Sequence, residues 1–183
     1  MSEYSHSSYA QTAPPPMHSA GTPGGGTAAA PPKKFAVLGA VGAVIALAGS
    51  CVNWVVSTSD SADGGVKGID GDGIITLIIA LVGAVLMLAA LATKKGVLYL
   101  IGAATGLATA IVLAINMASP ERLLAQKLQD EEGVSAKVAE KAAEQAAKLY
   151  DLTPGPGIYI ALIGALMILV FGVLGFLKTR SGR

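Results

Sequence analysis

Four long runs of this chain contain no Asp, Glu, Lys, Arg or His, and they constrain its fold more than any other feature. They cover residues 35–56, 73–93, 96–117 and 154–177. A bilayer core about 30 Å thick is crossed by roughly 20 helical residues, so each run is long enough to span a membrane. The continuous Leu, Ile, Val and Ala of these runs also lack the alternation of a membrane β-barrel strand. We therefore predict four transmembrane helices.

A soluble helical protein with a very apolar core is the alternative. Its helices would carry a polar residue at every third or fourth position, which these runs do not. The composition, with 52% apolar residues, 14% charged residues and a mean hydropathy of +0.60, also favours a membrane protein. We predict an all-α membrane protein: a four-transmembrane-helix bundle with a disordered N-terminal tail and an extracytoplasmic helical hairpin.

The predicted segments follow from the runs and from what lies between them. The tail is rich in Pro, Gly, Ser and Ala, a composition that buries too little apolar surface to fold. We interpret it as a solvated leader; a docking or phosphorylation segment at Tyr4, Tyr9 and Thr22 is the alternative. The segments are a disordered cytoplasmic tail (1–32), transmembrane helix 1 (33–56), an outer acidic loop (57–72), transmembrane helix 2 (73–93), a tight Lys-Lys turn with transmembrane helix 3 (94–117), an outer helical hairpin (118–153), transmembrane helix 4 (154–177) and a cytoplasmic basic tail (178–183).

The basic residues orient the predicted spans. Seven crowd the membrane boundary on one side: Lys33, Lys34, Lys94, Lys95, Lys178, Arg180 and Arg183. Six lie on the other side: Lys67, Arg122, Lys127, Lys137, Lys141 and Lys148. The counts alone do not decide, but four of these six lie deep in a longer segment among acids, and the positive-inside rule weights short loops near span ends. We therefore predict that both termini are cytoplasmic.

The loop before the second span carries a short acidic motif, Asp70-Gly71-Asp72-Gly73. It resembles the start of a calcium loop, but EF-hand spacing requires further oxygen ligands where Ile74 and Leu81 stand. A turn in which Asp72 caps the second span explains the same residues. We predict no metal site and no cofactor.

The outer segment 118–153 has the pattern of a helical hairpin. Ser119 and Pro120 can start one helix, Gly133 interrupts it, and Ser135 can cap a second. Apolar residues recur at helical spacing along both helices, at Leu124, Leu128, Val134, Val138, Ala142, Ala146 and Leu149. One interpretation is that this stripe packs on the protein's own bundle or lies on the lipid surface. The alternative is that it binds a partner, and the candidate partner face is then Val138, Ala142 and Leu149.

Small residues recur every fourth position in the spans. The most regular series is in the third span, and a shorter one is in the first. Small residues at this spacing let helix backbones approach closely, where dispersion forces hold them. The predicted helix-packing positions are Gly39, Ala43, Gly102, Gly106, Ala110 and Ala114.

The spans and the histidines limit the function classes. No span contains a charged residue, which argues against a pump or an ion-coupled transporter, whereas a passive pore through oligomerised helices stays open. Both histidines, His6 and His18, lie in the tail, and no Ser/His/Asp set, metal cluster or phosphate loop is present in the sequence. We predict that the protein is not an enzyme and has no catalytic residues.

The single cysteine allows a second interpretation of the first span. Leu47-Ala48-Gly49-Ser50-Cys51 resembles a bacterial lipoprotein cleavage box, so cleavage and acylation at Cys51 are the alternative. Against it, Val-Asn-Trp-Val-Val follows Cys51 and continues the span instead of starting a polar tether. We predict an unprocessed Cys51 that packs as a small apolar residue.

Several of these features together resemble a known type of protein. A Pro/Gly/Tyr-rich tail, Lys33-Lys34 before the first span, Asn53-Trp54 at its exit and Gly68 to Gly73 entering the second resemble small tetraspan membrane proteins of actinobacteria. The resemblance covers residues 1 to about 115 and implies a plasma-membrane location and no catalytic role. We predict a structural, scaffold or accessory subunit of a membrane complex, with a transporter or pore component as the alternative. Its expected partners are the lipid bilayer and a membrane protein or a second copy, with no nucleic acid.

Overall fold

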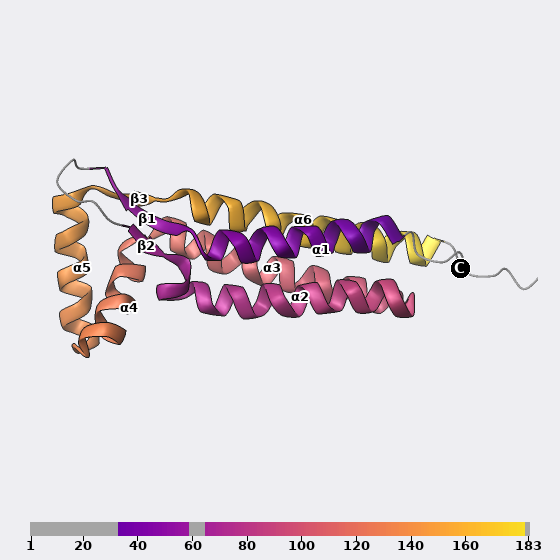
Figure 1. Ribbon diagram of the computed structural model, residues 1–183, viewed down its shortest axis with the longest axis horizontal. Helices are drawn as coiled ribbons and strands as arrows, with labels where there is room; N and C mark the ends of the chain where they lie inside the picture. Colours follow the sequence, from indigo (N-terminus) through magenta and orange to yellow (C-terminus); the bar gives the residue numbers. More distant parts are fainter. Residues whose placement is uncertain (1–32, 59–64, 182–183) are drawn as a thin grey trace, which may run out of the picture.

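The computed structural model describes residues 33–58 and 65–181, which form a bundle of four long helices with a small head at one end (Figure 1). The bundle helices are α1 (Lys33–Ser50), α2 (Gly73–Thr93), α3 (Gly96–Ala118) and α6 (Pro156–Ser181). All four are long and apolar enough to cross a membrane, which confirms the predicted all-α class with four spanning helices. The predicted disordered tail, with its histidines, lies outside the described residues, as does Arg183.

The bundle interior consists mostly of small residues with a few large ones such as Met87 and Ile168, and many large apolar residues lie on the outside. Every buried residue of α1 is Ala, Gly or Ser. Many branched side chains point outward, as with Val85 (58% exposed) and Ile163 (56% exposed). In water such a surface would be strongly unfavourable at about 25 cal/mol per Å² of apolar area, whereas in hydrocarbon it costs nothing. The arrangement is therefore that of an integral membrane protein.

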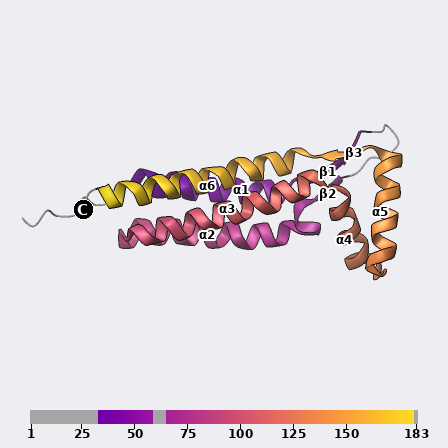
Figure 2. The ribbon, with the colours of Figure 1, turned by 180° about the vertical axis from the view of Figure 1, so that it is seen from behind.

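Each bundle helix packs against two neighbours, in the cyclic order α1, α2, α3, α6. Seen from behind, α6 runs alongside α1 and α3 for most of its length (Figure 2). The α1–α6 contact is made by glycines on both helices. A methyl group added at Gly42 would lie 2.9 Å from the Gly164 carbonyl oxygen, and one added at Gly49 would collide with the backbone of Ala161. These two helices thus touch backbone to backbone.

The first helix ends at Ser50, and not at residue 56 as predicted. Asn53–Ser57 forms strand β1, which pairs antiparallel with β2 (Gly65–Lys67) and β3 (Leu152–Pro154) in a sheet of order β2-β1-β3. Val55 and Val56 favour a strand because β-branched side chains fit a pleated surface. Trp54, placed by the sequence at the exit of the first span, is fully buried, and its indole nitrogen donates a 2.9 Å hydrogen bond to the carbonyl oxygen of Gly49.

The predicted helical hairpin is present as α4 (Glu121–Glu132) and α5 (Ala136–Tyr150). Gly133 separates them with a positive φ of 65°, a backbone conformation that glycine adopts without strain. The predicted side-chain caps are absent at both starts, since Pro120 is the N-cap residue of α4 and Ser135 makes no cap hydrogen bond.

Asp72 likewise stands at the start of α2 without capping it, because its carboxylate is engaged elsewhere. The short 3-10 helix η1 (Gly68–Asp70) precedes it.

Candidate functional site in the head

The head consists of the three strands, α4 and α5, and polar contacts fix it to the bundle. Gln126 on α4 donates from its amide nitrogen to Oδ1 of Asp72 at 2.6 Å and accepts the Asp72 backbone N–H at 3.0 Å. The next residue, Lys127, lies with its Nζ 3.6 Å from the Asp70 carboxylate. The end of β1 is tied to the end of α5, because the Ser57 hydroxyl donates to the Tyr150 carbonyl oxygen at 2.7 Å. The contacts of Gln126 therefore fix the head to the start of α2, and the contact of Ser57 holds the elements of the head together.

An apolar groove of about 550 Å³ lies between the sheet and the helical hairpin. One wall is the sheet, and the other is formed by α4 and α5. The charged residues of its lining, Lys127, Glu131 and Glu132, all come from α4. Its apolar lining is Val55, Val56, Val66, Leu124, Leu128, Ala142, Ala146, Tyr150 and Leu152. Such a concave apolar surface with few polar groups is the usual form of a binding site.

The predicted partner face divides between this groove and an exposed ridge. Ala142 lines the groove, whereas Val138 (55% exposed) and Leu149 (74% exposed) point to the surroundings. The residues that pack α5 on α4 are Ala139 and Ala143, both fully buried. Two small residues let the helices approach closely, so the larger Val and Leu side chains remain outside. Val138 and Leu149 therefore do not pack on the transmembrane bundle, whereas Leu124 of the same stripe packs against a core cluster that includes Leu113 and Ile158 of the bundle.

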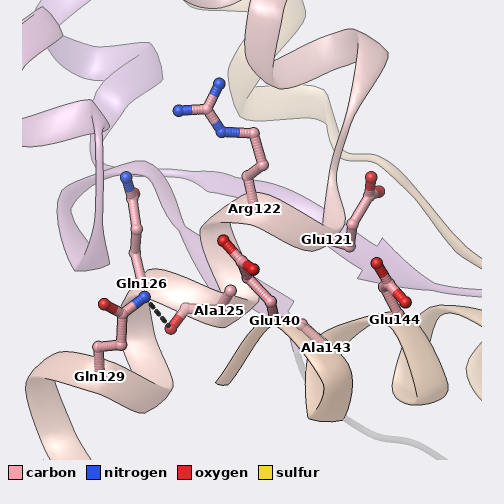
Figure 3. A pocket seen from close by; sticks show the side chains of 8 residues that line it. All are labelled: Glu121, Arg122, Ala125, Gln126, Gln129, Glu140, Ala143 and Glu144. Atoms are coloured by element: carbon pink, nitrogen blue, oxygen red, sulfur yellow. Dashed lines mark hydrogen bonds between the residues drawn. The ribbon is translucent and has the colours of Figure 1, made fainter. Parts of the chain in front are cut away.

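A second, polar cleft of about 290 Å³ lies between α4 and α5 (Figure 3). Glu140 and Glu144 project from α5 toward α4, where Glu121 and Arg122 line the same cleft. Residues 33–58 and 65–181 contain no group of three or more His, Cys, Asp or Glu side chains placed to hold a metal ion. Asp70 and Asp72, the residues of the calcium-like motif, are occupied by Lys127 and Gln126.

The predicted packing positions of the bundle are placed as follows. Gly39 and Gly102 both lie against Met87, and Ala43 is fully buried. Gly106 faces α6, where an added methyl group would lie 2.6 Å from the backbone nitrogen of Leu169. Ala110 is half-buried and Ala114 is exposed.

The small residues at every fourth position of α3 do not all lie in its contact with the neighbouring helices, for a geometric reason. Four residues turn a helix by about 400°, so each step of the series moves roughly 40° around the helix. The buried face of α3 instead follows alternating steps of four and three, through Gly102, Gly106, Thr109, Leu113 and Asn116. This is the spacing of left-handed helix packing. Ala114 therefore lies outside the helix contacts that form within one chain.

The bundle interior contains few polar side chains. Its buried polar residues in the spanning region are Ser50, Thr76, Thr109 and Asn116, of which Ser50 and Asn116 donate to carbonyl oxygens one turn back in their own helices. The four helices carry their charged side chains only at the end opposite the head. Within the described residues, no relay of titratable groups therefore crosses the bundle.

Comparison of the chain with protein-family models, with curated proteins and with solved structures gave no match. The fold and the head together define the class: an integral membrane protein with four spanning helices and a compact head of helical hairpin and sheet at one end.

Proposed function

We propose that this protein is a non-enzymatic scaffold or accessory subunit of a complex in the plasma membrane, with both termini cytoplasmic and the head outside. The observation that carries the proposal is the apolar groove between the sheet and the hairpin. The head is fixed by hydrogen bonds to the start of α2, so the groove has a defined shape before anything binds. A preformed site loses less entropy on binding than a flexible one.

The chemistry of the groove indicates what it binds. Its floor and walls are Val, Leu and Ala, which favour an apolar segment of the partner. At its rim, Lys127 is engaged with Asp70 and Glu131, whereas Glu132 is exposed and unpaired among the described residues. The net charge of this rim is negative, which attracts basic residues and repels acidic ones. We therefore expect an extracytoplasmic apolar segment of a membrane protein, flanked by Lys or Arg.

The bundle supports an anchoring role over the alternative of a pore. Its helices are close enough for glycines to contact backbone atoms of the neighbouring helix, at Gly42 and Gly106 for example. A water-filled path needs a continuous polar lining, and the bundle interior has only a few buried polar side chains, among them Ser50, Thr76 and Thr109. The bundle thus holds the head at the membrane surface.

The test is site-specific crosslinking in intact cells. A photoreactive amino acid at Ala146, which lines the groove, should crosslink to a partner, and one at the exposed Lys137, outside the groove, should not. Mass spectrometry of the crosslinked peptide should identify an apolar segment with basic neighbours. Crosslinking from both positions alike would contradict a specific groove.

Substitutions distinguish the groove from the exposed ridge. The pair Ala142→Glu and Ala146→Glu places charge in the groove and should abolish copurification of the partner after mild detergent extraction. The pair Val138→Glu and Leu149→Glu changes the ridge and should leave copurification intact. The reverse result would move the partner contact to the ridge, and retention by both variants would refute the proposed function.

A further inference from the structure

A cavity of about 460 Å³ lies at the opposite end of the bundle from the head. It is formed where the turn between α2 and α3 meets the C-terminal part of α6. Lys94 and Lys95 from the turn and Arg180 from α6 line it together with Val97 and Phe176. Gly96 packs directly on Thr179, where an added methyl group would lie 2.7 Å from Thr179 Cγ2, and this contact holds the turn against α6.

The cations of this cavity have no counter-ion in the described part of the chain. Among the described residues, the only bases in ion pairs are Arg122 and Lys127, and both lie in the head. The three basic side chains are exposed, and α3 begins between them with its positive dipole end. The cavity is therefore a region of positive potential that no acidic side chain of residues 33–58 or 65–181 neutralises.

An apolar surface continues from the cavity along the bundle. Val97 (59% exposed) is followed three residues later by Leu100 (45% exposed), on the same face of α3. On α6, Phe176 lines the cavity, and Val173 lies one turn further toward the middle of the bundle and is also exposed. A free phosphate ion would use only the cations. A lipid would use the cations for its headgroup and the apolar residues for its acyl chains.

We propose that this cavity binds an anionic phospholipid of the leaflet at this end, with the headgroup phosphate between Lys94, Lys95 and Arg180. Lys and Arg donate charge-assisted hydrogen bonds to phosphate oxygens, and basic pockets between membrane helices bind anionic headgroups. The acyl chains lie along Val97 and Leu100. The lipid links the α2–α3 turn to α6, and it stabilises the end of the bundle that the head does not reach.

The experiment uses the full-length protein in a mild non-ionic detergent. The probes are dioleoylphosphatidylglycerol, the zwitterionic dioleoylphosphatidylcholine with the same chains, and glycerol 3-phosphate as the soluble headgroup. Native mass spectrometry measures the bound lipid, and thermal denaturation measures the stabilisation. The wild-type protein should prefer the anionic lipid, and glycerol 3-phosphate at equal concentration should give no comparable stabilisation.

A charge-matched pair of variants separates a site from general surface charge. The cavity variant is Lys94→Gln, Lys95→Gln and Arg180→Gln. The control, Lys33→Gln, Lys34→Gln and Lys178→Gln, removes the same charge at the same end but outside the cavity. The preference for the anionic lipid should fall about tenfold or more in the cavity variant and stay near the wild-type value in the control.

Three results would overturn the proposal: no lipid preference in the wild-type protein, equal losses in the two triple variants, or equal stabilisation by glycerol 3-phosphate. The single change Lys94→Gly guards against misfolding as the cause of a loss. Lys94 has a left-handed backbone (φ 54°), which glycine adopts more readily than lysine, so this variant should fold at least as well as the wild type. It should nevertheless bind the anionic lipid more weakly.

Discussion

Gln126 and Asp72 form a reciprocal pair in which each residue both donates and accepts a hydrogen bond. The amide nitrogen of Gln126 donates to the Asp72 carboxylate at 2.6 Å, and the Asp72 backbone N–H donates to the Gln126 amide oxygen at 3.0 Å. The two residues are 54 positions apart, so the pair joins the start of α2 to the middle of α4. The part-buried Asp72 side chain therefore connects the head to the start of α2, and it does not cap that helix.

Removing the hydrogen bonds between Gln126 and Asp72 should loosen the head while the bundle stays folded. In Gln126→Ala, Asp72 loses the 2.6 Å hydrogen bond to its Oδ1 and the acceptor of its backbone N–H, and keeps only the longer contacts of its Oδ2 with Asn116 and Arg122. A part-buried polar group that loses its hydrogen-bond partner costs about 1–3 kcal/mol. Amide hydrogen exchange in residues 121–132 should therefore become about tenfold faster or more. Gln129→Ala is the control, because the Gln129 amide bonds only to Ala125 within its own helix. Equal acceleration in both variants would show that the pair does not fix the head.

Gly106 and Ala114 should respond in opposite ways to the same substitution. Gly106→Leu places a branched side chain where the helices α3 and α6 touch, so it should destabilise the protein by about 1–3 kcal/mol or more. Ala114→Leu adds the same group on the exposed face and should have little effect. Thermal denaturation in detergent measures both. A lower melting temperature for Ala114→Leu would place that residue in an interface.

Trp54 is the only tryptophan of the chain, and it reports on the junction between bundle and head. Because its ring is fully buried and hydrogen-bonded to Gly49, its fluorescence should be blue-shifted and weakly quenched by acrylamide. The ring packs on Gly68, whose replacement by valine should displace it and increase quenching. The denatured protein provides the reference. Strong quenching in the native protein would contradict the buried position.

The orientation can be tested with single cysteines in a Cys51→Ser background. Lys141→Cys on the head and Lys95→Cys in the α2–α3 turn both replace exposed residues at opposite ends of the molecule. A membrane-impermeant maleimide added to intact cells should label only Lys141→Cys, and permeabilised cells should show labelling of both. Labelling of Lys95→Cys alone would reverse the predicted topology.

Cys51 should be unmodified in the mature protein. It lies exposed in the turn between α1 and β1. Cleavage before it would remove α1 and leave the glycine face of α6 at Gly164 without its neighbour. Intact-mass measurement should therefore find residues 1–50 attached. A mass that corresponds to their loss with an added diacylglyceryl group would establish the lipoprotein alternative.

The sequence predicted the four helices well because a membrane span is encoded locally, in twenty or so consecutive residues. The hairpin was also predicted from local signals, of which Gly133 was the decisive one. The sheet was not, because β2 and β3 have only three residues each, and β1 pairs with β3 across about one hundred residues of sequence. Asp72 was expected to act on its own helix, and nothing near it in the sequence points to Gln126.

The candidate site was predicted in part for the same reason. Ala142 was named from its helical spacing, but the opposite wall of the groove comes from the unpredicted strands. Val138 and Leu149 share that spacing and lie outside the groove, since the packing of α5 on α4 is decided by Ala139 and Ala143. Lys94, Lys95 and Arg180 were used to orient the chain. Only the packing of the α2–α3 turn on α6 places them around one cavity.

Because α1 and α6 pack through their glycines, the bundle can close only after α6, its last helix, has been synthesised. The ribosome releases the chain from its N-terminus, so α1 enters the membrane long before α6 exists. Throughout that interval the open glycine face of α1 must be covered by lipid or by the insertion machinery. Chains that end early lack the helix that closes this face, so we expect quality-control proteases to remove them and no functional fragments to accumulate.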